Sequence, residues 1–122
     1  MTITQILFSF TGRISRQTYW WATLGIVTGA FAWGILAVII GAGFRNADPA
    51  ADTFPLILLA PMYLWIVWCS LAVSVKRWHD RGKSGLWTFI QLIPYIGPLW
   101  ALIELGFLKG TEGPNEFGEA MY

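Results

Sequence analysis

Three long stretches of this chain contain no charged residue. They lie between three pairs of charged residues: Arg16 and Arg45, Asp52 and Lys76, and Lys83 and Glu104. A helix of roughly 20 apolar residues, at about 1.5 Å per residue, crosses the ~30 Å hydrocarbon core of a bilayer. The pattern therefore predicts an all-α integral membrane protein, with residues 1–122 as a single membrane domain and transmembrane helices at about 19–44, 54–75 and 86–108.

Composition favours lipid over water as the surrounding medium. The chain is 56% hydrophobic and 12% charged, with a mean hydropathy of +0.56, so it has too little polar material to cover a water-soluble fold. The first apolar stretch is also much longer than the roughly 7 to 15 apolar residues of a secretory signal. We expect it to be retained as a membrane helix.

The first 18 residues predict a short segment that lies at the membrane surface. Apolar side chains are interspersed with polar ones before Gly12, a pattern typical of interfacial segments. The alternative is a disordered start to the chain. After residue 108 the chain is polar again, which predicts a polar C-terminal tail.

The third apolar stretch is interrupted by two prolines, Pro94 and Pro98, with Gly97 between them. Prolines lack a backbone N–H group and weaken a helix, so a bend is expected here. Two structures are compatible with the pattern: a kinked helix that crosses the membrane, or a re-entrant hairpin that leaves on the side it entered. We favour the kinked third helix, because a lipid-exposed turn would leave polar backbone groups unsatisfied.

The distribution of lysine and arginine predicts the orientation. Six cations lie in the N-terminal segment and in the link between the second and third stretches: Arg13, Arg16, Lys76, Arg77, Arg81 and Lys83. The first loop has Arg45 and the tail has Lys109. The positive-inside rule therefore places the N-terminus and the second link in the cytoplasm. With three crossings the C-terminus would be periplasmic, whereas a re-entrant hairpin would return it to the cytoplasm.

Small residues along the first stretch predict close helix packing. Gly25 and Gly29 form a G-x-x-x-G pattern on one face, and Gly34 and Gly41 lie on a second face about 130° round the helix. We expect contacts with the other two membrane helices. A homodimer is the alternative, for which G-x-x-x-G alone is a weak signal.

The densest polar cluster, residues 76–85, contains four cations, one carboxylate and the single histidine. Backbone N–H groups at the start of the following helix, together with cationic side chains, are suited to binding a phosphate or an anionic lipid head. The alternative is that these cations only fix topology and extend to the lipid surface. The residues of the predicted anion site are Arg77, Arg81, Lys83, Ser84 and Gly85.

Catalytic and metal-binding motifs are missing from the sequence. Gly82-Lys83-Ser84 resembles the end of a P-loop, but Arg77 stands where the first glycine would be required. His79 and Ser84 have no G-x-S-x-G context, and one histidine with the distant Cys69 cannot supply a metal site. We expect no enzyme activity, cofactor or metal. A net charge of +1 gives no indication of a nucleic-acid partner.

Glu104 is predicted near the outer end of the third helix, five residues before Lys109. We expect it to be an interfacial carboxylate that pairs with Arg45. Lys83 is excluded as a partner in this interpretation, because a continuous helix of 21 residues would be about 32 Å long.

Three groups of residues resemble motifs of the bacterial inner-membrane family known as domain of unknown function 805. They are Phe10-Thr11-Gly12-Arg13 with Arg16 and Tyr19-Trp20; Arg77-Trp78-His79-Asp80 with Gly82, Ser84 and Gly85; and Gly110-Thr111 with Gly113-Pro114-Asn115 and Gly118. Together they span nearly the whole chain. The resemblance implies a bacterial cytoplasmic membrane location and no established activity. The chain departs from the pattern at Glu116, where a basic residue followed by an aromatic one would be expected.

The resemblance also marks Arg13, Arg16, His79, Asp80 and Ser84 as positions of interest. Under the predicted topology the arginines and Asp80 lie near one membrane surface. We therefore predict a structural ion network formed by Asp80 with Arg13, Arg16 and Arg77.

Two functional classes are compatible with the sequence. The first is a noncatalytic membrane interaction or organising protein, whose partners would be membrane lipids and a second copy or other membrane proteins. The alternative is a small transport component or accessory subunit, in which the broken third stretch would line a path.

Overall fold

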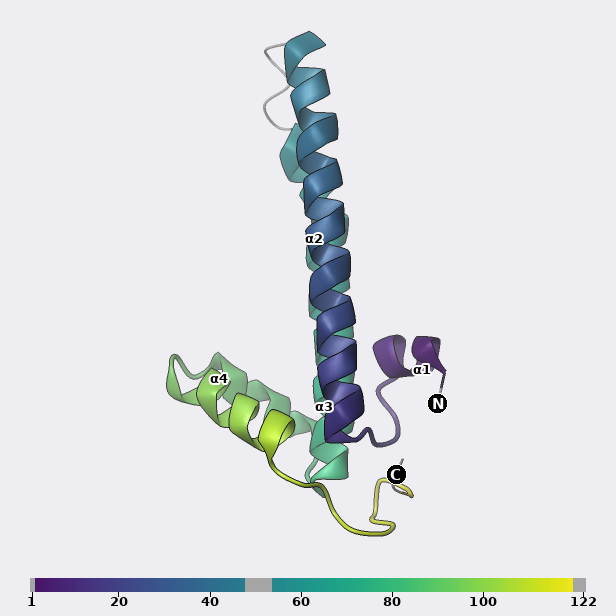
Figure 1. Ribbon diagram of the computed structural model, residues 1–122. Coiled ribbons are helices and arrows are strands. Elements are labelled where there is room, and N and C mark those ends of the chain that lie inside the picture. Colours follow the sequence, from purple (N-terminus) through teal and green to yellow (C-terminus); the bar gives the residue numbers. More distant parts are fainter. Residues whose placement is uncertain (1, 48–53, 120–122) are drawn as a thin grey trace.

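Two long helices form the body of the molecule, α2 (Arg16–Ala47) and α3 (Phe54–Asp80). The computed structural model describes residues 2–47 and 54–119, and Figure 1 shows the two helices running side by side in opposite directions. Both are long and apolar enough to cross a membrane. The prediction of two membrane helices in the first two apolar stretches is therefore supported; α2 extends beyond both of its predicted limits, whereas α3 begins at the predicted residue and ends at Asp80, beyond its predicted end.

Most of the apolar surface of these helices faces outward. Only 22% of the most apolar window of each helix is buried within the protein. The buried cluster between them is small and contains Ile26 of α2 with Cys69 and Val73 of α3. Because many leucine, isoleucine and phenylalanine side chains of the two helices are exposed, among them Phe31, Ile39 and Leu64, this outer surface is suited to lipid.

The glycines of α2 occupy different environments. Gly41 is buried, and Gly34 lies close to Met62 of α3. A Cβ atom at Gly29 would lie 3.2 Å from the Trp65 ring nitrogen. Gly25 is exposed, with nothing within 4 Å of its Cβ position, so the structure places it outside the close contacts of the described residues.

The N-terminal segment forms a short helix, α1 (Ile3–Phe8), that packs on α3. Thr2 and Gln5 form a capping box at its start. At its other end the buried Lys76 donates to three carbonyl groups, those of Gln5, Ile6 and Ser9. A cation at the C-terminal end of a helix satisfies carbonyl groups that have no partner within the helix.

The third apolar stretch folds into a hairpin. Its first arm is the 3₁₀ helix η1 (Gly85–Leu92), and its second arm consists of α4 (Ile96–Ala101) followed by the π-helical η2 (Leu102–Phe107). None of these elements is long enough to cross a bilayer. The predicted kinked third helix is therefore not confirmed, because the chain turns back and its second arm returns to the end of α3.

The turn of the hairpin explains why the prediction failed. Tyr95 has a positive φ of 65°, and the N–H groups of Ile93, Ile96 and Gly97 all donate to nearby carbonyl groups. The turn therefore satisfies most of its own polar backbone groups, which removes the objection to a re-entrant arrangement. Gly97 is also essential to the packing, since a Cβ atom there would lie 1.9 Å from the Ile90 carbonyl oxygen.

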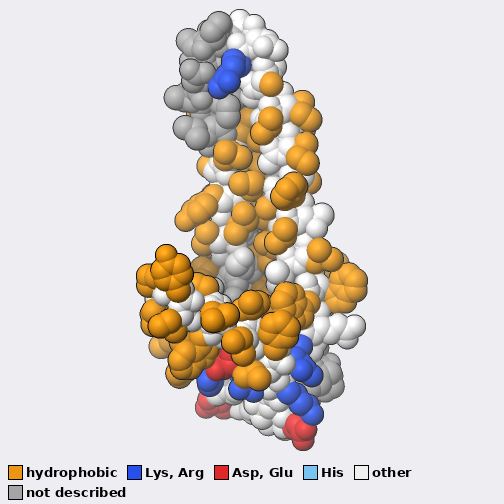
Figure 2. All heavy atoms as spheres, turned by 60° about the vertical axis from the view of Figure 1, so that its left-hand side comes forward, with side chains coloured by type: hydrophobic (Ala, Val, Ile, Leu, Met, Phe, Trp, Pro, Cys, Tyr) orange, Lys and Arg blue, Asp and Glu red, His pale blue; other side chains and the backbone are white. Residues whose placement is uncertain are grey.

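The hairpin also changes the position of the C-terminal tail. In Figure 1 the hairpin and α1 project to opposite sides of the helix pair, near the end where α2 begins and α3 finishes. The tail runs beneath that same end and contacts the N-terminal segment, so the predicted placement of the two termini at opposite ends is corrected. On the face shown in Figure 2, most charged side chains gather at this end, which we call the polar end.

The contact at Gly97 predicts the sensitivity of the hairpin to a single methyl group. Gly97→Ala should lower the free energy of unfolding by about 2 kcal/mol or more, because the new Cβ atom forces the two arms apart. Gly25→Ala, in open space on α2, is the matched control and should leave stability unchanged or slightly increased. Thermal unfolding in detergent measures both, and equal stability of the two variants would contradict the hairpin packing.

Candidate functional site

A buried carboxylate lies at the centre of the polar end. Asp80, the last residue of α3, is fully buried between Arg13 and Arg77, which are 2% and 0% exposed. The Nε and Nη2 atoms of Arg13 lie 3.1 and 3.0 Å from Oδ1 of Asp80, and Nη1 of Arg77 donates a hydrogen bond to Oδ2 of Asp80. Both carboxylate oxygens are thus paired, which is the condition for keeping such charges away from solvent.

Arg13 also holds the C-terminal tail. Its Nη1 donates to the carbonyl groups of Gly113 and Gly118 at 2.7 and 3.1 Å, and its Nη2 donates to that of Thr111 at 2.6 Å. In the reverse direction, the N–H of Thr111 donates to the backbone carbonyl of Asp80 at 2.7 Å. The guanidinium group therefore joins the N-terminal segment, the end of α3 and the tail.

Three arginines, Arg16, Arg77 and Arg81, bind the end of the hairpin. Arg77 donates to the carbonyl groups of Leu105, at 2.7 Å, and Leu108. Arg16 donates to the Phe107 carbonyl at 2.9 Å, and Arg81 donates to that of Lys109. These carbonyl groups lie at the end of a helix, where they lack partners within the helix and attract cations.

Gly110 is required by the close approach of the tail to Asp80. A Cβ atom at this position would lie 2.0 Å from Oδ2 of Asp80. Any other residue would displace either the tail or the carboxylate. This contact gives a physical reason for the glycine that follows Lys109 in the sequence.

His79 connects the same three segments. Its Nδ1 lies 3.0 Å from the Gly12 carbonyl oxygen, and its ring stacks on Phe117 at 4.2 Å and 6°. The side chain of Asn115 donates to the His79 carbonyl at 2.9 Å. These contacts join the end of α3 to the N-terminal segment and to the tail.

Glu104 lies in the hairpin and pairs with Lys83, the residue that the sequence analysis excluded as a partner because of its distance along the chain. Its Oε1 accepts hydrogen bonds from Lys83 at 2.8 Å and from the Trp100 ring nitrogen at 3.0 Å. Arg81 lies 3.7 Å from the second carboxylate oxygen. The estimate of 32 Å was wrong because it assumed one continuous helix, and the expected partner Arg45 lies in the last turn of α2, far from the polar end.

The environment of Glu104 favours its charged form. Burial raises the pKa of this carboxyl, but the hydrogen bonds from Lys83 and Trp100 and the charges of Lys83 and Arg81 outweigh it. The pKa of Glu104 is therefore below its ordinary value. Lys83 additionally lies 4.6 Å from the centre of the Trp87 ring, so the ammonium group is held by both a carboxylate and an aromatic face.

The residues of the predicted anion site do not converge on one surface. Arg77 is buried in the Asp80 network, and Ser84 caps η1 by accepting a hydrogen bond from the Leu86 N–H. Gly85 packs closely against Val75. Only Arg81 and Lys83 combine a charge with partial exposure, at 25% and 30% of their side chains.

The predicted ion network is placed differently at one position. The structure brings Arg13 and Arg77 to Asp80, whereas Arg16 binds the hairpin carbonyl of Phe107. Sequence reasoning missed two contacts. Lys76 of α3 donates to carbonyl groups at the end of α1, and Trp20 donates to the Gly106 carbonyl at 2.8 Å. Backbone carbonyl partners leave no signature in residue type, although Gly106 and Gly110 mark places where side chains are excluded.

No metal centre is formed among residues 2–47 and 54–119. Within these ranges no group of three or more histidine, cysteine, aspartate or glutamate side chains is arranged to hold an ion.

Comparison with known proteins links this arrangement to a family. A family model described as "Protein of unknown function (DUF805)" matches residues 7–119. Uncharacterized protein YiiR of Escherichia coli K12 is 34% identical to this chain, and the matched region covers 98% of this chain and 90% of YiiR. Inner membrane proteins YhaI and YhaH of the same strain are 30% and 32% identical, each covering 89% of this chain and 82% and 84% of their own. No solved structure matches significantly.

Removing the charge of Asp80 should destabilise the protein. Asp80→Asn leaves two buried arginine charges without a counter-ion, so the free energy of unfolding should fall by about 3 to 5 kcal/mol. Glu112→Gln is the control, because the ion pair of this exposed carboxylate with the exposed Lys109 contributes little, and the substitution should change nothing measurable. Thermal unfolding combined with limited proteolysis of the tail tests this, and an Asp80→Asn variant as stable as the control would refute the central role of the carboxylate.

Proposed function

Because this chain belongs to the DUF805 family of proteins of unknown function, we propose from its structure that it is a noncatalytic protein of the bacterial cytoplasmic membrane. Its role in this proposal is to organise lipids, and the membrane proteins next to them, in one leaflet. The names of the relatives YhaI and YhaH, both inner membrane proteins, support the location.

One observation carries the proposal: two apolar elements extend sideways from the same end of the helix pair (Figure 1). Helix α1 exposes Ile3 and Phe8, and the hairpin exposes Leu92 and Tyr95 at 77% and 91%. Elements of this kind displace lipid on one side of a bilayer only. A protein that simply crossed the membrane would need neither of them.

The exposed cations of the polar end support contact with anionic lipid heads. Lys83 and Lys109 are 30% and 58% exposed, and Arg16 and Arg81 also reach the surface. Juxtamembrane lysine and arginine side chains are attracted to anionic lipid by about 1 kcal/mol each. In this proposal the tightly buried Arg13 and Arg77 shape the polar end, and the exposed cations bind the lipid.

The same distribution of charge supports a cytoplasmic polar end. All lysine and arginine residues except Arg45 belong to the segments that meet there. The positive-inside rule then places the N-terminus, the 76–85 turn and the tail together in the cytoplasm. The loop that joins α2 to α3 would be periplasmic.

Labelling with an impermeant thiol reagent tests this orientation. Single cysteines replace the exposed residues Thr11, Asn46 and Glu116 in a Cys69→Ala background. Asn46→Cys should react in intact cells, whereas Thr11→Cys and Glu116→Cys should react only after the inner membrane is opened. Reaction of Glu116→Cys in intact cells would show that the tail is periplasmic and would refute the proposed orientation.

The lipid contacts are tested by the lipids that stay with the purified protein. The double variant Lys83→Gln, Lys109→Gln should retain at least threefold less phosphatidylglycerol relative to phosphatidylethanolamine, because each lost cation weakens attraction to the anionic lipid by up to about 1 kcal/mol. Arg45→Gln, at the other end of the helix pair, is the control and should keep the wild-type ratio. An unchanged ratio in the double variant would contradict the role of these cations.

A further inference from the structure

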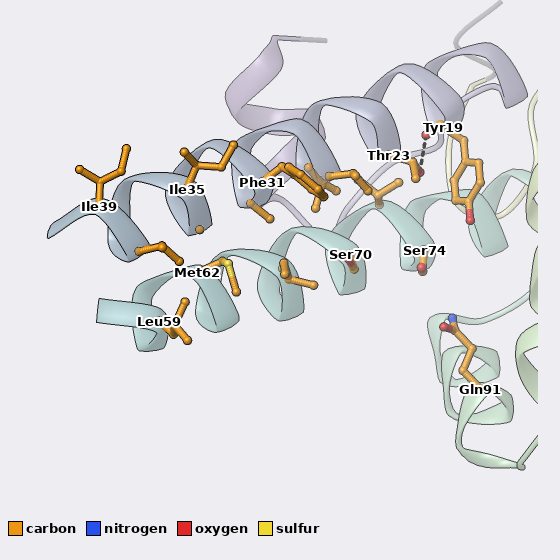
Figure 3. A pocket seen from close by; sticks show the side chains of 17 residues that line it. Tyr19, Thr23, Phe31, Ile35, Ile39, Leu59, Met62, Ser70, Ser74 and Gln91 are labelled. Atoms are coloured by element: carbon orange, nitrogen blue, oxygen red, sulfur yellow. Dashed lines mark hydrogen bonds between the residues drawn. The ribbon is translucent and has the colours of Figure 1, made fainter. Parts of the chain in front are cut away.

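Two apolar grooves lie on either side of α3 near the hairpin. The first, of about 850 Å³, runs between α2 and α3 and is shown in Figure 3. The second, of about 760 Å³, lies between α3 and η1. Both are open to the region that lipid would occupy around the helix pair.

The grooves meet at a polar corner. Four residues line both of them, the polar Ser70, Ser74 and Gln91 and the apolar Ile66. In Figure 3 the side chain of Gln91 points from the hairpin toward the two serines, while the opposite end of the first groove is lined by apolar side chains such as Ile39 and Leu59. The first groove extends from this shared corner between apolar side chains, and the second includes the corner and runs along α3 from Ile66 to Val75.

A buried hydroxyl group without a partner lies beside this corner. Thr88 lines the second groove and is 9% exposed, and its Oγ1 has no hydrogen-bond partner among the described residues. Leaving a buried hydroxyl unsatisfied costs free energy, which an acceptor bound in the groove would recover. Ser74, in both grooves, is 8% exposed.

The depth of the corner matches the boundary between lipid heads and chains. Helix α1, whose composition suits that boundary, packs against Cys69 and Val73 and is tied to Lys76. Ser70 and Ser74 lie in this same segment of α3. From Ser74 to Leu59, α3 rises about 22 Å, which exceeds half of the ~30 Å hydrocarbon layer and can accommodate a chain from one leaflet.

We propose that the two grooves bind a diacyl phospholipid, with one acyl chain in each groove. Its ester carbonyl groups accept hydrogen bonds at the shared corner from Ser70, Ser74, Thr88 and Gln91. Hydroxyl and amide groups are the donors that an ester oxygen requires. The forked shape of the cavity matches the forked shape of the lipid, and recognition is of the ester region and independent of headgroup charge.

Native mass spectrometry of the full-length protein in detergent tests the proposal with defined lipids. The probes are dipalmitoyl phosphatidylglycerol and dipalmitoyl phosphatidylethanolamine, each compared with its diether analogue, which lacks the ester carbonyls. One lipid should bind per chain, and the diester should bind at least threefold more tightly than the diether with either headgroup. Equal binding of diester and diether would overturn the proposal.

Two variants connect the preference to the corner. Gln91→Leu and Thr88→Val should each lower the preference for the diester, because each removes one of the four donors. Thr28→Val and Gln17→Leu are matched controls at exposed positions that line neither groove, and they should keep the wild-type preference. An undiminished preference in both corner variants would refute the assignment.

A stability measurement separates ligand binding from a structural role. Thr88→Val should raise the unfolding temperature of the lipid-free protein, because it removes the unpartnered hydroxyl, and should reduce the upward shift produced by the diester lipid. A lower unfolding temperature with an unchanged lipid shift would show that the hydroxyl only supports the fold. If the Thr88 variant does not fold, the same lipid shift is measured with Gln91→Leu, because Gln91 is exposed and its substitution should leave the fold intact. Binding of phosphatidylglycerol alone would assign the lipid to the exposed cations and contradict the grooves.

Discussion

The architecture of this protein depends on one buried carboxylate shared by two arginines. Asp80 ends α3, and Arg13 and Arg77 occupy both of its oxygens while their other donors bind the tail and the hairpin. Charges removed from water in this way are stable only when every donor and acceptor is used. The Asp80 network therefore joins the N-terminal segment, the end of α3 and the tail into a single polar end. The hairpin is held against the same end by Arg77.

The hairpin follows from the same constraint. A chain that crossed the membrane a third time would carry residues 105–109 away from Arg77, Arg16 and Arg81, and these guanidinium groups would lose their carbonyl partners. The turn at Tyr95 and the contact at Gly97 bring the chain back. Lys83 and Glu104, at the start and near the end of the hairpin, then meet at 2.8 Å.

Sequence reasoning predicted what depends on composition and failed where one segment meets another. Runs without charge located α2 and α3, and family motifs drew attention to Arg13 and Asp80 before any contact was known. The third apolar stretch was interpreted as a kinked crossing because Pro94 and Pro98 indicate a bend without giving its angle. The angle is set by backbone hydrogen bonds within the turn and by the missing Cβ of Gly97, which are tertiary features. The carbonyl partners of the arginines were equally beyond prediction, since every residue has a carbonyl group.

The long sequence separation within the Asp80 network has a consequence for biogenesis. Arg13 is made 67 residues before its carboxylate and about 100 residues before the tail carbonyls that complete its hydrogen bonds. During synthesis the N-terminal segment must therefore wait at the lipid surface with an unpaired charge while both long helices insert. The polar end cannot close until the tail is made, so a chain truncated before Thr111 would contain both long helices but lack the hydrogen bonds from Arg13 to the tail.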